Sequence, residues 1–529
     1  MGGEANRVPE SGAGAPASAG AAVEDGHHMA RGAAANALVL LASNFRAVFT
    51  FLIARLLGQA ALGRFGLAFA ATELLSKAGM LGFDNSIIPF LAPHVASGDV
   101  ATSRRLFRQV SVVAGVGSLV VAAIAVPLGT QLGLSGGVDA LAHGGSIMLL
   151  ALPGIAVARI ATSTSRSVLA MSNEFYSRGL VETWVTTGVF VVAVALGMRD
   201  EAPAVAVVVG TGAAACVAWV LASRALTRRI PGLAQPSASV RDDVDPARFA
   251  TFWARLRFSL PIAGSSLLTV LVMQADVLLL GTFVNRAPGV TAEAFGVFCI
   301  ASEIAGGLRK VRQVFDPIFA PIVANRAVFT DRASLRATVS GPGRWVLAVQ
   351  LPIVAVMVLA GGPILSIYGP GFSSGALWLA LLALAHGTNT FAGLVETLLM
   401  IERPGLNLVN AGATVAIQVL TGLWLIPRLG VTGAALAMCI GFASQGVLRF
   451  VEVRHVFGWH WPWRGLVRPL VAAAVAAVPA AALALAGGAW AEVAAALLFV
   501  GLYAGGWLWL GADPADREIW QRLTRRRAS

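Results

Sequence analysis

The sequence predicts an all-α polytopic membrane protein with about fourteen transmembrane helices. Composition is the first reason: 57% of the 529 residues are hydrophobic and only 12% are charged. A soluble domain of this length cannot cover such an apolar surface with so few charges. The second reason is that long apolar runs recur from residue 33 to residue 511. The third is an internal repeat, because duplicated halves are typical of membrane transporters.

The repeat links the two halves of the chain. In each half a Phe-Gly pair is followed by a hydroxyl residue with Glu, and then by Asp and Pro. The first copy is Phe65-Gly66, Thr72-Glu73, Asp84 and Pro89, and the second is Phe295-Gly296, Ser302-Glu303, Asp316 and Pro321. The spacing from Phe to Glu is identical in both copies, and one gap aligns the rest. The repeat predicts equivalent halves with a carboxylate at the same place in each.

The apolar runs predict the transmembrane helices in order. Their approximate bounds are 33–57, 62–93, 106–131, 145–170, 176–198, 203–224, 257–284, 293–324, 341–366, 375–400, 405–426, 431–453, 466–487 and 490–511. The runs 62–93 and 293–324 are longer than a bilayer requires, so we expect bends in them. The residues that favour bends are Gly79, Gly82, Pro89 and Pro93 in the first run and Pro317 and Pro321 in the second.

The arginines between the spans predict the orientation in the membrane. Most of them fall in every second loop, at positions 104, 105, 108, 178, 228, 229, 241, 248, 326, 332, 336, 454 and 464. The alternate loops contain little beyond Arg64, Arg199, Arg286 and Arg428. Because cytoplasmic loops are enriched in arginine, we expect both termini in the cytoplasm.

The segments outside the spans complete the predicted organisation. Residues 1–28 are rich in Ala, Gly, Ser and Pro, and we expect a disordered cytoplasmic arm there rather than a signal peptide, with Met29 as an alternative start. The predicted domains that follow are an N-lobe at 29–228, a cytoplasmic linker at 229–256, a C-lobe at 257–455, two further helices at 456–511 and a basic cytoplasmic tail at 512–529.

Charge and cysteine content narrow the function classes. The formal net charge is +12, but the arginines are spread between apolar spans, which favours lipid headgroups over nucleic acid as partners. The cysteines Cys216, Cys299 and Cys439 all lie in apolar runs and have no zinc or disulfide spacing. The sequence has no Gly-rich phosphate loop with its Lys, so we expect neither nucleotide hydrolysis nor a bound cofactor.

Several short motifs resemble one family of exporters. They are Arg55-Leu56-Leu57-Gly58 before Phe65-Gly66, Leu81-Gly82-Phe83-Asp84-Asn85, Phe258-Ser259-Leu260-Pro261, Gln274-Ala275-Asp276, Ile367-Tyr368-Gly369-Pro370-Gly371-Phe372, and the run from Leu425 to Ala435. In this order and spacing, over about residues 30–460, the chain resembles the polysaccharide branch of the MOP (multidrug/oligosaccharidyl-lipid/polysaccharide) exporter superfamily, the Wzx-like O-antigen flippases.

The resemblance implies both an architecture and a cargo. It implies two six-helix lobes related by a pseudo-two-fold axis along the membrane normal, a central cavity, and two C-terminal helices. The implied cargo is an undecaprenyl-pyrophosphate-linked oligosaccharide, moved across the bacterial cytoplasmic (inner) membrane for lipopolysaccharide O-antigen, capsule or exopolysaccharide biosynthesis. Membrane lipid and a glycan polymerase or chain-length regulator are the further partners that it suggests.

Cations at membrane depth are the candidate ligands for a pyrophosphate. They are Arg46, Arg159, Arg309, Lys310 and Arg312. Each would cost at least about 2.5–3.5 kcal/mol in hydrocarbon, so we expect them to face a wet cavity or the lobe interface. The planar fork of arginine suits bidentate phosphate binding. His386 is a further candidate for the cargo path, although a membrane histidine can equally be a packing residue.

Carboxylates at membrane depth are the candidate coupling groups. They are Glu73, Asp276, Glu303 and Glu396, and either H⁺ or Na⁺ could couple through them. A purely structural interpretation also exists for several charges. By helical spacing, Glu73 could pair with Lys77, Asp316 with Arg312, and Glu303 with Lys310.

Two other function classes remain open at this point. A MATE-like, ion-coupled exporter of small molecules would also have duplicated lobes, but it would have about twelve spans and an acidic cavity. A membrane glycosyltransferase or glycan polymerase would usually carry a large extramembrane loop or an acidic metal motif. The only acidic cluster is Asp242-Asp243 with Asp245, which a solvated linker explains.

Overall fold

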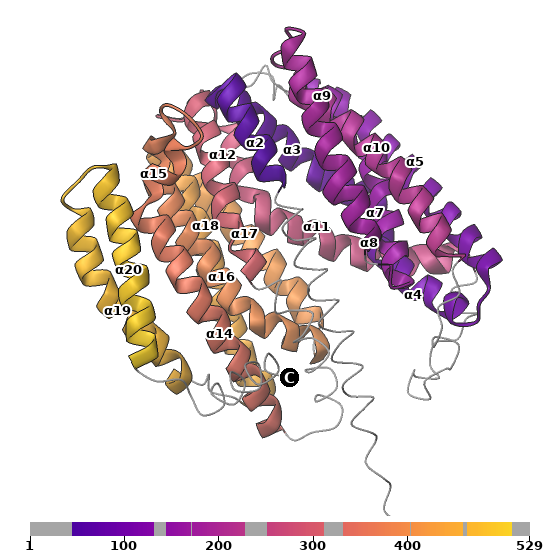
Figure 1. Cartoon of the computed structure of the whole chain (residues 1–529). Helices are drawn as coiled ribbons and strands as arrows, with labels where there is room; N and C mark the ends of the chain where they lie inside the picture. The colour runs from indigo at the N-terminus through magenta and orange to yellow at the C-terminus, as the bar shows by residue number, and fades with distance from the viewer. Residues whose placement is uncertain are drawn as a thin grey trace, which may run out of the picture.

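A computed structural model describes residues 45–131, 144–170, 172–227, 251–311, 332–402, 404–458 and 463–509. Every regular element in these ranges is a helix (Figure 1). Among these residues, nine helices are long and apolar enough to cross a membrane, and the shorter helical stretches Ala47–Leu57 and Val346–Leu359 are also apolar. The chain is therefore a multi-pass helical membrane protein, as the sequence predicts.

The first half of the chain folds into one bundle, the N-lobe. Its helices are α2 (Phe45–Leu57), α3 (Gln59–Met80), α4 (Phe83–Ala96), α5 (Val100–Gln131), α6 (Gly144–Leu149), α7 (Leu152–Ser167), α8 (Ser172–Glu174), the π-helix η3 (Phe175–Glu182), α9 (Thr183–Ala195) and α10 (Ala202–Ala225). Each of the first six predicted spans overlaps one or more of these helices. The division of the fourth span into α6 and α7, and the π-helix in the fifth, are features that hydropathy did not indicate.

The second half forms the C-lobe and two trailing helices. The C-lobe contains α11 (Phe252–Thr282), α12 (Ala292–Gly306), α14 (Arg332–Leu359), α15 (Gly361–Ser366), the 3₁₀-helix η5 (Phe372–Gly375), α16 (Ala376–Glu402), α17 (Pro404–Leu429) and α18 (Val431–Phe457). Then α19 (Trp463–Ala484) and α20 (Ala489–Trp509) pack on each other and on α14, where the Tyr503 hydroxyl donates to the Ala348 carbonyl at 3.0 Å.

The long second span breaks where α3 meets α4. Leu81 and Gly82 there have φ of 52° and 79°, which ends one helix and starts the next. A Cβ on Gly82 would collide with the Ser259 carbonyl oxygen of α11, so glycine also permits a close helix approach. The expected bend at Gly82 is confirmed, whereas Pro89 and Pro93 lie inside α4. Pro317 and Pro321 lie outside the described residues.

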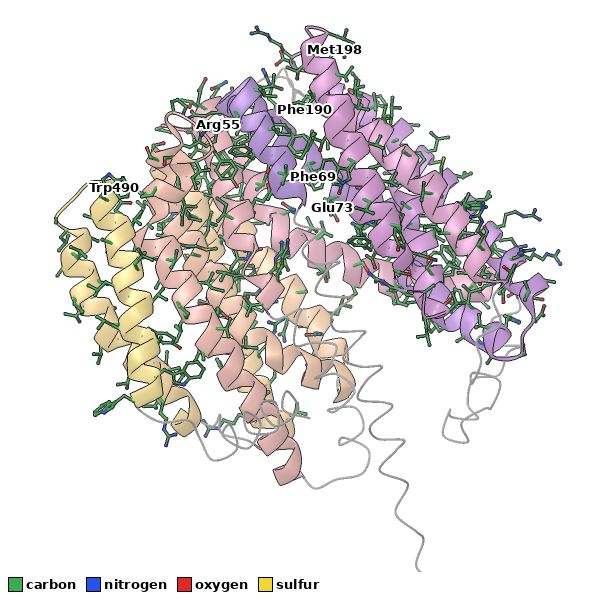
Figure 2. All side chains as sticks on the ribbon, in the orientation of Figure 1. Arg55, Phe69, Glu73, Phe190, Met198 and Trp490 are labelled. Carbon is green, nitrogen blue, oxygen red and sulfur yellow. The ribbon has the colours of Figure 1, made fainter. Side chains whose placement is uncertain are left out.

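The two lobes meet through the repeated segments and diverge away from them (Figure 1). Helix α3 of the N-lobe packs against α12 of the C-lobe, and the largest hydrophobic cluster joins Phe65 to Phe295 and Phe298 across this contact. Helix α11 packs on α3 and α4 as well as on α17. It therefore straddles the predicted boundary between the lobes. In Figure 2, Phe69 and Glu73 lie between the two bundles, whereas Trp490 lies at the outer edge, where it is 87% exposed.

Candidate functional site

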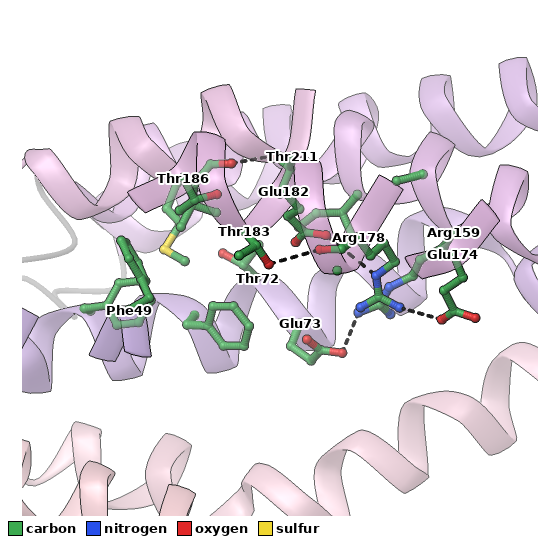
Figure 3. A pocket seen from close by; sticks show the side chains of 17 residues that line it. Phe49, Thr72, Glu73, Arg159, Glu174, Arg178, Glu182, Thr183, Thr186 and Thr211 are labelled. Atoms are coloured by element: carbon green, nitrogen blue, oxygen red, sulfur yellow. Dashed lines mark hydrogen bonds and ion pairs between the residues drawn. The ribbon is translucent and has the colours of Figure 1, made fainter. Parts of the chain in front are cut away.

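The N-lobe encloses a cavity of about 280 Å³ (Figure 3). Helices α2, α3, α6, α7, α9, α10 and the π-helix η3 all contribute to it, together with Glu174 of α8. Aromatic rings form one part of the wall, where Phe49 and Phe65 meet edge to face at 5.4 Å. The hydroxyl residues that line it are Thr72, Thr183, Thr186 and Thr211, and the charged ones are Glu73, Arg159, Glu174, Arg178 and Glu182. The cavity thus combines an apolar wall with hydroxyls and both signs of charge.

Arg159 and Glu73 form the ion pair on the wall nearest the C-lobe. The Arg159 Nη2 donates to Glu73 Oε1 at 2.6 Å, with the two side chains only 17% and 25% exposed. Helix α7 packs against α3 and so brings Arg159 close to Glu73. Small buried residues of α7 such as Ser163 and Thr164 permit this packing. Gly154, near the start of α7, lies directly against the backbone of Thr211 on α10. Arg159, predicted as a headgroup ligand, therefore does line a cavity.

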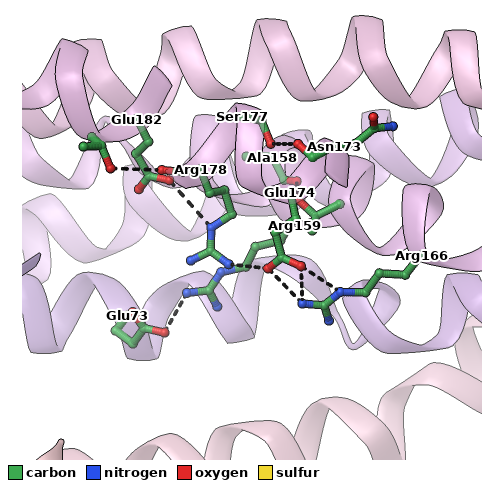
Figure 4. A network of polar contacts seen from close by, with 11 residues as sticks. Glu73, Ala158, Arg159, Arg166, Asn173, Glu174, Ser177, Arg178 and Glu182 are labelled. Atoms are coloured by element: carbon green, nitrogen blue, oxygen red, sulfur yellow. Dashed lines mark hydrogen bonds and ion pairs between the residues drawn. The ribbon is translucent and has the colours of Figure 1, made fainter. Parts of the chain in front are cut away.

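A second set of charges extends from this pair (Figure 4). Glu174 accepts from Arg166 at 2.6 Å, and Arg178 approaches Glu174 at 3.5 Å and Glu182 at 3.6 Å. Arg178 and Glu182 lie in the π-helix η3, which is an uncommon element that occurs preferentially at functional sites.

Lys77 completes the charged cluster at the break between α3 and α4. Its Nζ lies 2.5 Å from Asp84 Oδ2, and both side chains are largely buried. The structure therefore pairs Glu73 with Arg159 and Lys77 with Asp84, partners that the helical spacing of Glu73 and Lys77 did not indicate. Asp84 is a residue of the internal repeat, so one member of this pair occupies a repeated position.

The charges of the cluster balance. Its cations are Lys77, Arg159, Arg166 and Arg178, and its carboxylates are Glu73, Asp84, Glu174 and Glu182. Four positive charges thus face four negative ones. Each charge has a partner of opposite sign within 4 Å, which offsets the cost of removing these groups from water.

A smaller cavity of about 60 Å³ lies where the lobes meet. Glu303 of α12, Arg309 just after the turn that follows α12, and His386 of α16 line it together with Gln274. Three predicted site residues thus come together in this cavity. Phe65 lines both cavities, which are therefore neighbours. Arg309 Nε donates to the Gly306 carbonyl at 3.1 Å.

The remaining predicted site residues are placed as follows. Asp276 is buried on α11 beside this smaller cavity, where it accepts a hydrogen bond from Ser302 at 2.9 Å. Lys310 is half-buried in the short helical segment that follows the turn at Gly307 and Leu308, and it is not among the residues that line the two cavities. Arg46 lies in α2 and Glu396 in α16, but their side chains are outside the described part of the chain. Arg312 also falls outside it.

Three charged residues that line the larger cavity are not among the predicted site residues. The arginine pattern places Arg178 in a cytoplasmic loop, whereas the structure places it in the π-helix on the cavity wall. Its position on the cytoplasmic side stays a prediction. Glu174 and Glu182 were not considered. Their spacing carried a signal, since Glu174, Arg178 and Glu182 recur every four residues with alternating charge, which is typical of one helix face.

The fold is shared with transporters of known structure. An inward-facing multidrug resistance MATE family transporter of the MOP superfamily superposes with a TM-score of 0.64 at 13% identity, over 79% of this chain and 94% of its own. The lipid II flippase MurJ, in an inward closed conformation, gives 0.63 at 11% identity, over 89% of this chain and 97% of its own. The Vibrio cholerae MATE transporter VcmN gives 0.55 at 17% identity, over 80% and 96%.

Sequence comparison adds no family to this result. No family model matches the chain, and no curated protein matches it. The structural matches alone show that the chain has the fold of MOP-superfamily membrane transporters. The Wzx-like resemblance within that superfamily stays a prediction.

Proposed function

We propose that this protein is a flippase for undecaprenyl-pyrophosphate-linked oligosaccharides. The observation that carries the proposal is that Arg159 and Arg178 line a cavity with four threonine hydroxyls within the N-lobe. Guanidinium groups bind phosphate oxygens in pairs, and hydroxyls suit sugars. Arg309 in the adjoining cavity supplies a further cation at the lobe interface. The lipid II flippase, whose cargo is named as a lipid, also has this fold and matches 89% of the chain.

Alternating access is the mechanism that the arrangement of the lobes supports. The lobes pack together along α3 and α12 and diverge toward the end where α4 meets α5. From the arginine distribution we expect that diverging end to face the cytoplasm, and we propose that the structure is an inward-facing state in a bacterial cytoplasmic membrane. The headgroup enters from this end, while the lipid tail stays in the bilayer. Glu303 and Asp276, beside the smaller cavity, are the carboxylates through which H⁺ or Na⁺ would couple.

Transport of a lipid-linked glycan by purified protein tests the proposal. In proteoliposomes, Arg159→Gln and Arg309→Gln should each lower the flipping rate at least about tenfold, since a charge-assisted hydrogen bond to phosphate is worth about 1.5–3 kcal/mol. Arg64→Gln is the matched control, because Arg64 pairs with Asp200 in an exposed position away from both cavities. Flipping at the normal rate by both cavity variants would contradict a cation-lined headgroup path.

Export of small organic cations is the second candidate function. The phenylalanine wall of Phe49, Phe65 and Phe69, beside the carboxylates of Glu73 and Glu182, favours it. The same proteoliposomes distinguish the two functions. If the protein exports ethidium, with loss on Glu73→Gln, but flips no lipid-linked glycan, the second candidate is correct and the flippase proposal is wrong.

A further inference from the structure

Glu73 and Glu174 are the two cavity carboxylates that contact arginines most closely, but they are held differently. Glu174 is bound by both Arg166 and Arg178 and is only 12% exposed. Glu73 is 25% exposed and contacts Arg159 from a different helix, α3 against α7. Of the two, Glu73 is therefore the carboxylate that an entering ligand can reach and move.

An anion that binds Arg159 must compete with Glu73. Both side chains line the same cavity, and the Glu73 oxygen already lies at hydrogen-bond distance from Arg159 Nη2. A diphosphate brings at least two negative charges and several acceptor oxygens, whereas a carboxylate brings one charge and two oxygens. A diphosphate is thus a stronger partner for the arginine than Glu73, and a monophosphate is a weaker competitor than a diphosphate.

The balanced charges of the cluster suggest why Glu73 pairs with Arg159 when no cargo is bound. A carrier has to reorient without cargo as well as with it, and an arginine without a partner at membrane depth is costly. Glu73 supplies that partner. Because its side chain is more exposed than that of Glu174, a headgroup can reach and displace it.

We propose that Glu73 is a placeholder for the cargo's phosphate on Arg159. It holds the guanidinium when no cargo is bound, and an anionic headgroup displaces it. Glu73 thereby lowers the affinity of the site for any anion that binds Arg159. The inference rests on the proposed flippase function and deepens it, since it identifies the residue that sets headgroup affinity.

Binding of inorganic pyrophosphate and inorganic phosphate to the full chain in lipid nanodiscs tests the placeholder. Glu73→Gln keeps the shape of the side chain and removes its charge, so it should tighten pyrophosphate binding at least about tenfold. Phosphate binding should tighten by a similar factor, because Glu73 competes with both anions for the same guanidinium. Arg159→Gln should abolish binding. Asp200→Asn is the matched control, because it neutralises an ion-paired carboxylate outside the cavity and should change nothing.

The flipping rate, measured beside pyrophosphate affinity, distinguishes the placeholder role of Glu73 from a purely structural role. Glu73→Gln should bind pyrophosphate more tightly yet flip cargo more slowly, whereas a folding defect would weaken both. Suppose that Arg159→Gln abolishes pyrophosphate binding, but Glu73→Gln leaves it unchanged or weakens it. That result would overturn the placeholder role of Glu73 and leave the headgroup site intact. Absence of pyrophosphate binding in wild type and variants alike would overturn the headgroup site, and this inference with it.

Discussion

At the scale of residues, the N-lobe charges show why helical spacing alone does not identify ion pairs. Glu73 and Lys77 are four residues apart on α3 and could have paired locally. The structure gives each a partner from another element, Arg159 of α7 for Glu73 and Asp84 of α4 for Lys77. Burial favours this outcome, because a partner brought by another helix shields both charges more fully than a neighbour on the same surface.

The Lys77–Asp84 pair should contribute to stability rather than to cargo binding. Both side chains are largely buried, at 17% and 6% exposure, and neither lines the two cavities. Asp84→Asn leaves the Lys77 charge uncompensated and should lower the free energy of unfolding by about 3–5 kcal/mol. We expect a clear fall in the midpoint of thermal unfolding in detergent, and recovery when Lys77→Met is added.

The surface pair Arg64–Asp200 is the matched control for this prediction. Its side chains are 36% and 67% exposed, so Asp200→Asn should change the free energy of unfolding by no more than about 1 kcal/mol. Equal effects of Asp84→Asn and Asp200→Asn would mean that burial does not govern these pairs.

At the scale of elements, the α3–α12 crossing explains why the repeat contains Phe-Gly. Gly296 lies so close to α3 that a Cβ there would collide with the Gln59 carbonyl oxygen, and a Cβ on Gly66 would lie 2.7 Å from Cys299 Sγ. The adjoining Phe65 and Phe295 are buried in the cluster that joins the lobes. The repeated motif thus marks the place where the two halves touch.

The glycine at this crossing predicts a specific substitution effect. Gly296→Ala forces α12 away from α3 and should destabilise the protein by about 1–3 kcal/mol, because overpacking a close helix contact has this cost. Gly212→Ala in α10 is the control, since nothing lies within 4 Å of the added Cβ. It should be neutral or slightly stabilising, because alanine favours a helix over glycine. Thermal unfolding of both variants measures the difference, and equal midpoints would contradict a tight crossing.

How far the sequence predicts the structure depends on the range of the contacts involved. Hydropathy and the glycine positions predict the helices and the break at Gly82, because these follow from local composition. The pairing of Arg159 with Glu73 joins residues far apart in the chain, so no local pattern reveals it. Arg178 was misplaced because a charged stripe at the end of a span looks like a loop when the π-helix that carries it is not recognised.

At the scale of the whole molecule, the described lobes are held together on one side and diverge on the other. The hydrophobic cluster that contains Phe65, Phe295 and Phe298 spans the α3–α12 contact. The buried residues of a second cluster, around Phe83 and Phe107, all belong to the N-lobe, and Leu256 and Phe258 of α11 pack against them. Alternating access therefore requires the α3–α12 contact to open when the other side closes. A bond across this contact should stop the cycle.

Gly66→Cys creates such a bond with one substitution, because Cys299 already faces this position. The Cβ added at residue 66 lies 3.1 Å from the Cys299 Cβ, slightly closer than the 3.5–4.5 Å of a disulfide, so a small outward shift allows the bond to form. We expect oxidation to abolish transport by this variant and a reductant to restore it. The variant with Cys299→Ser added should transport equally under both conditions. Transport that continues after mass spectrometry has shown a complete disulfide would mean that the lobes do not separate along α3 and α12 during the cycle.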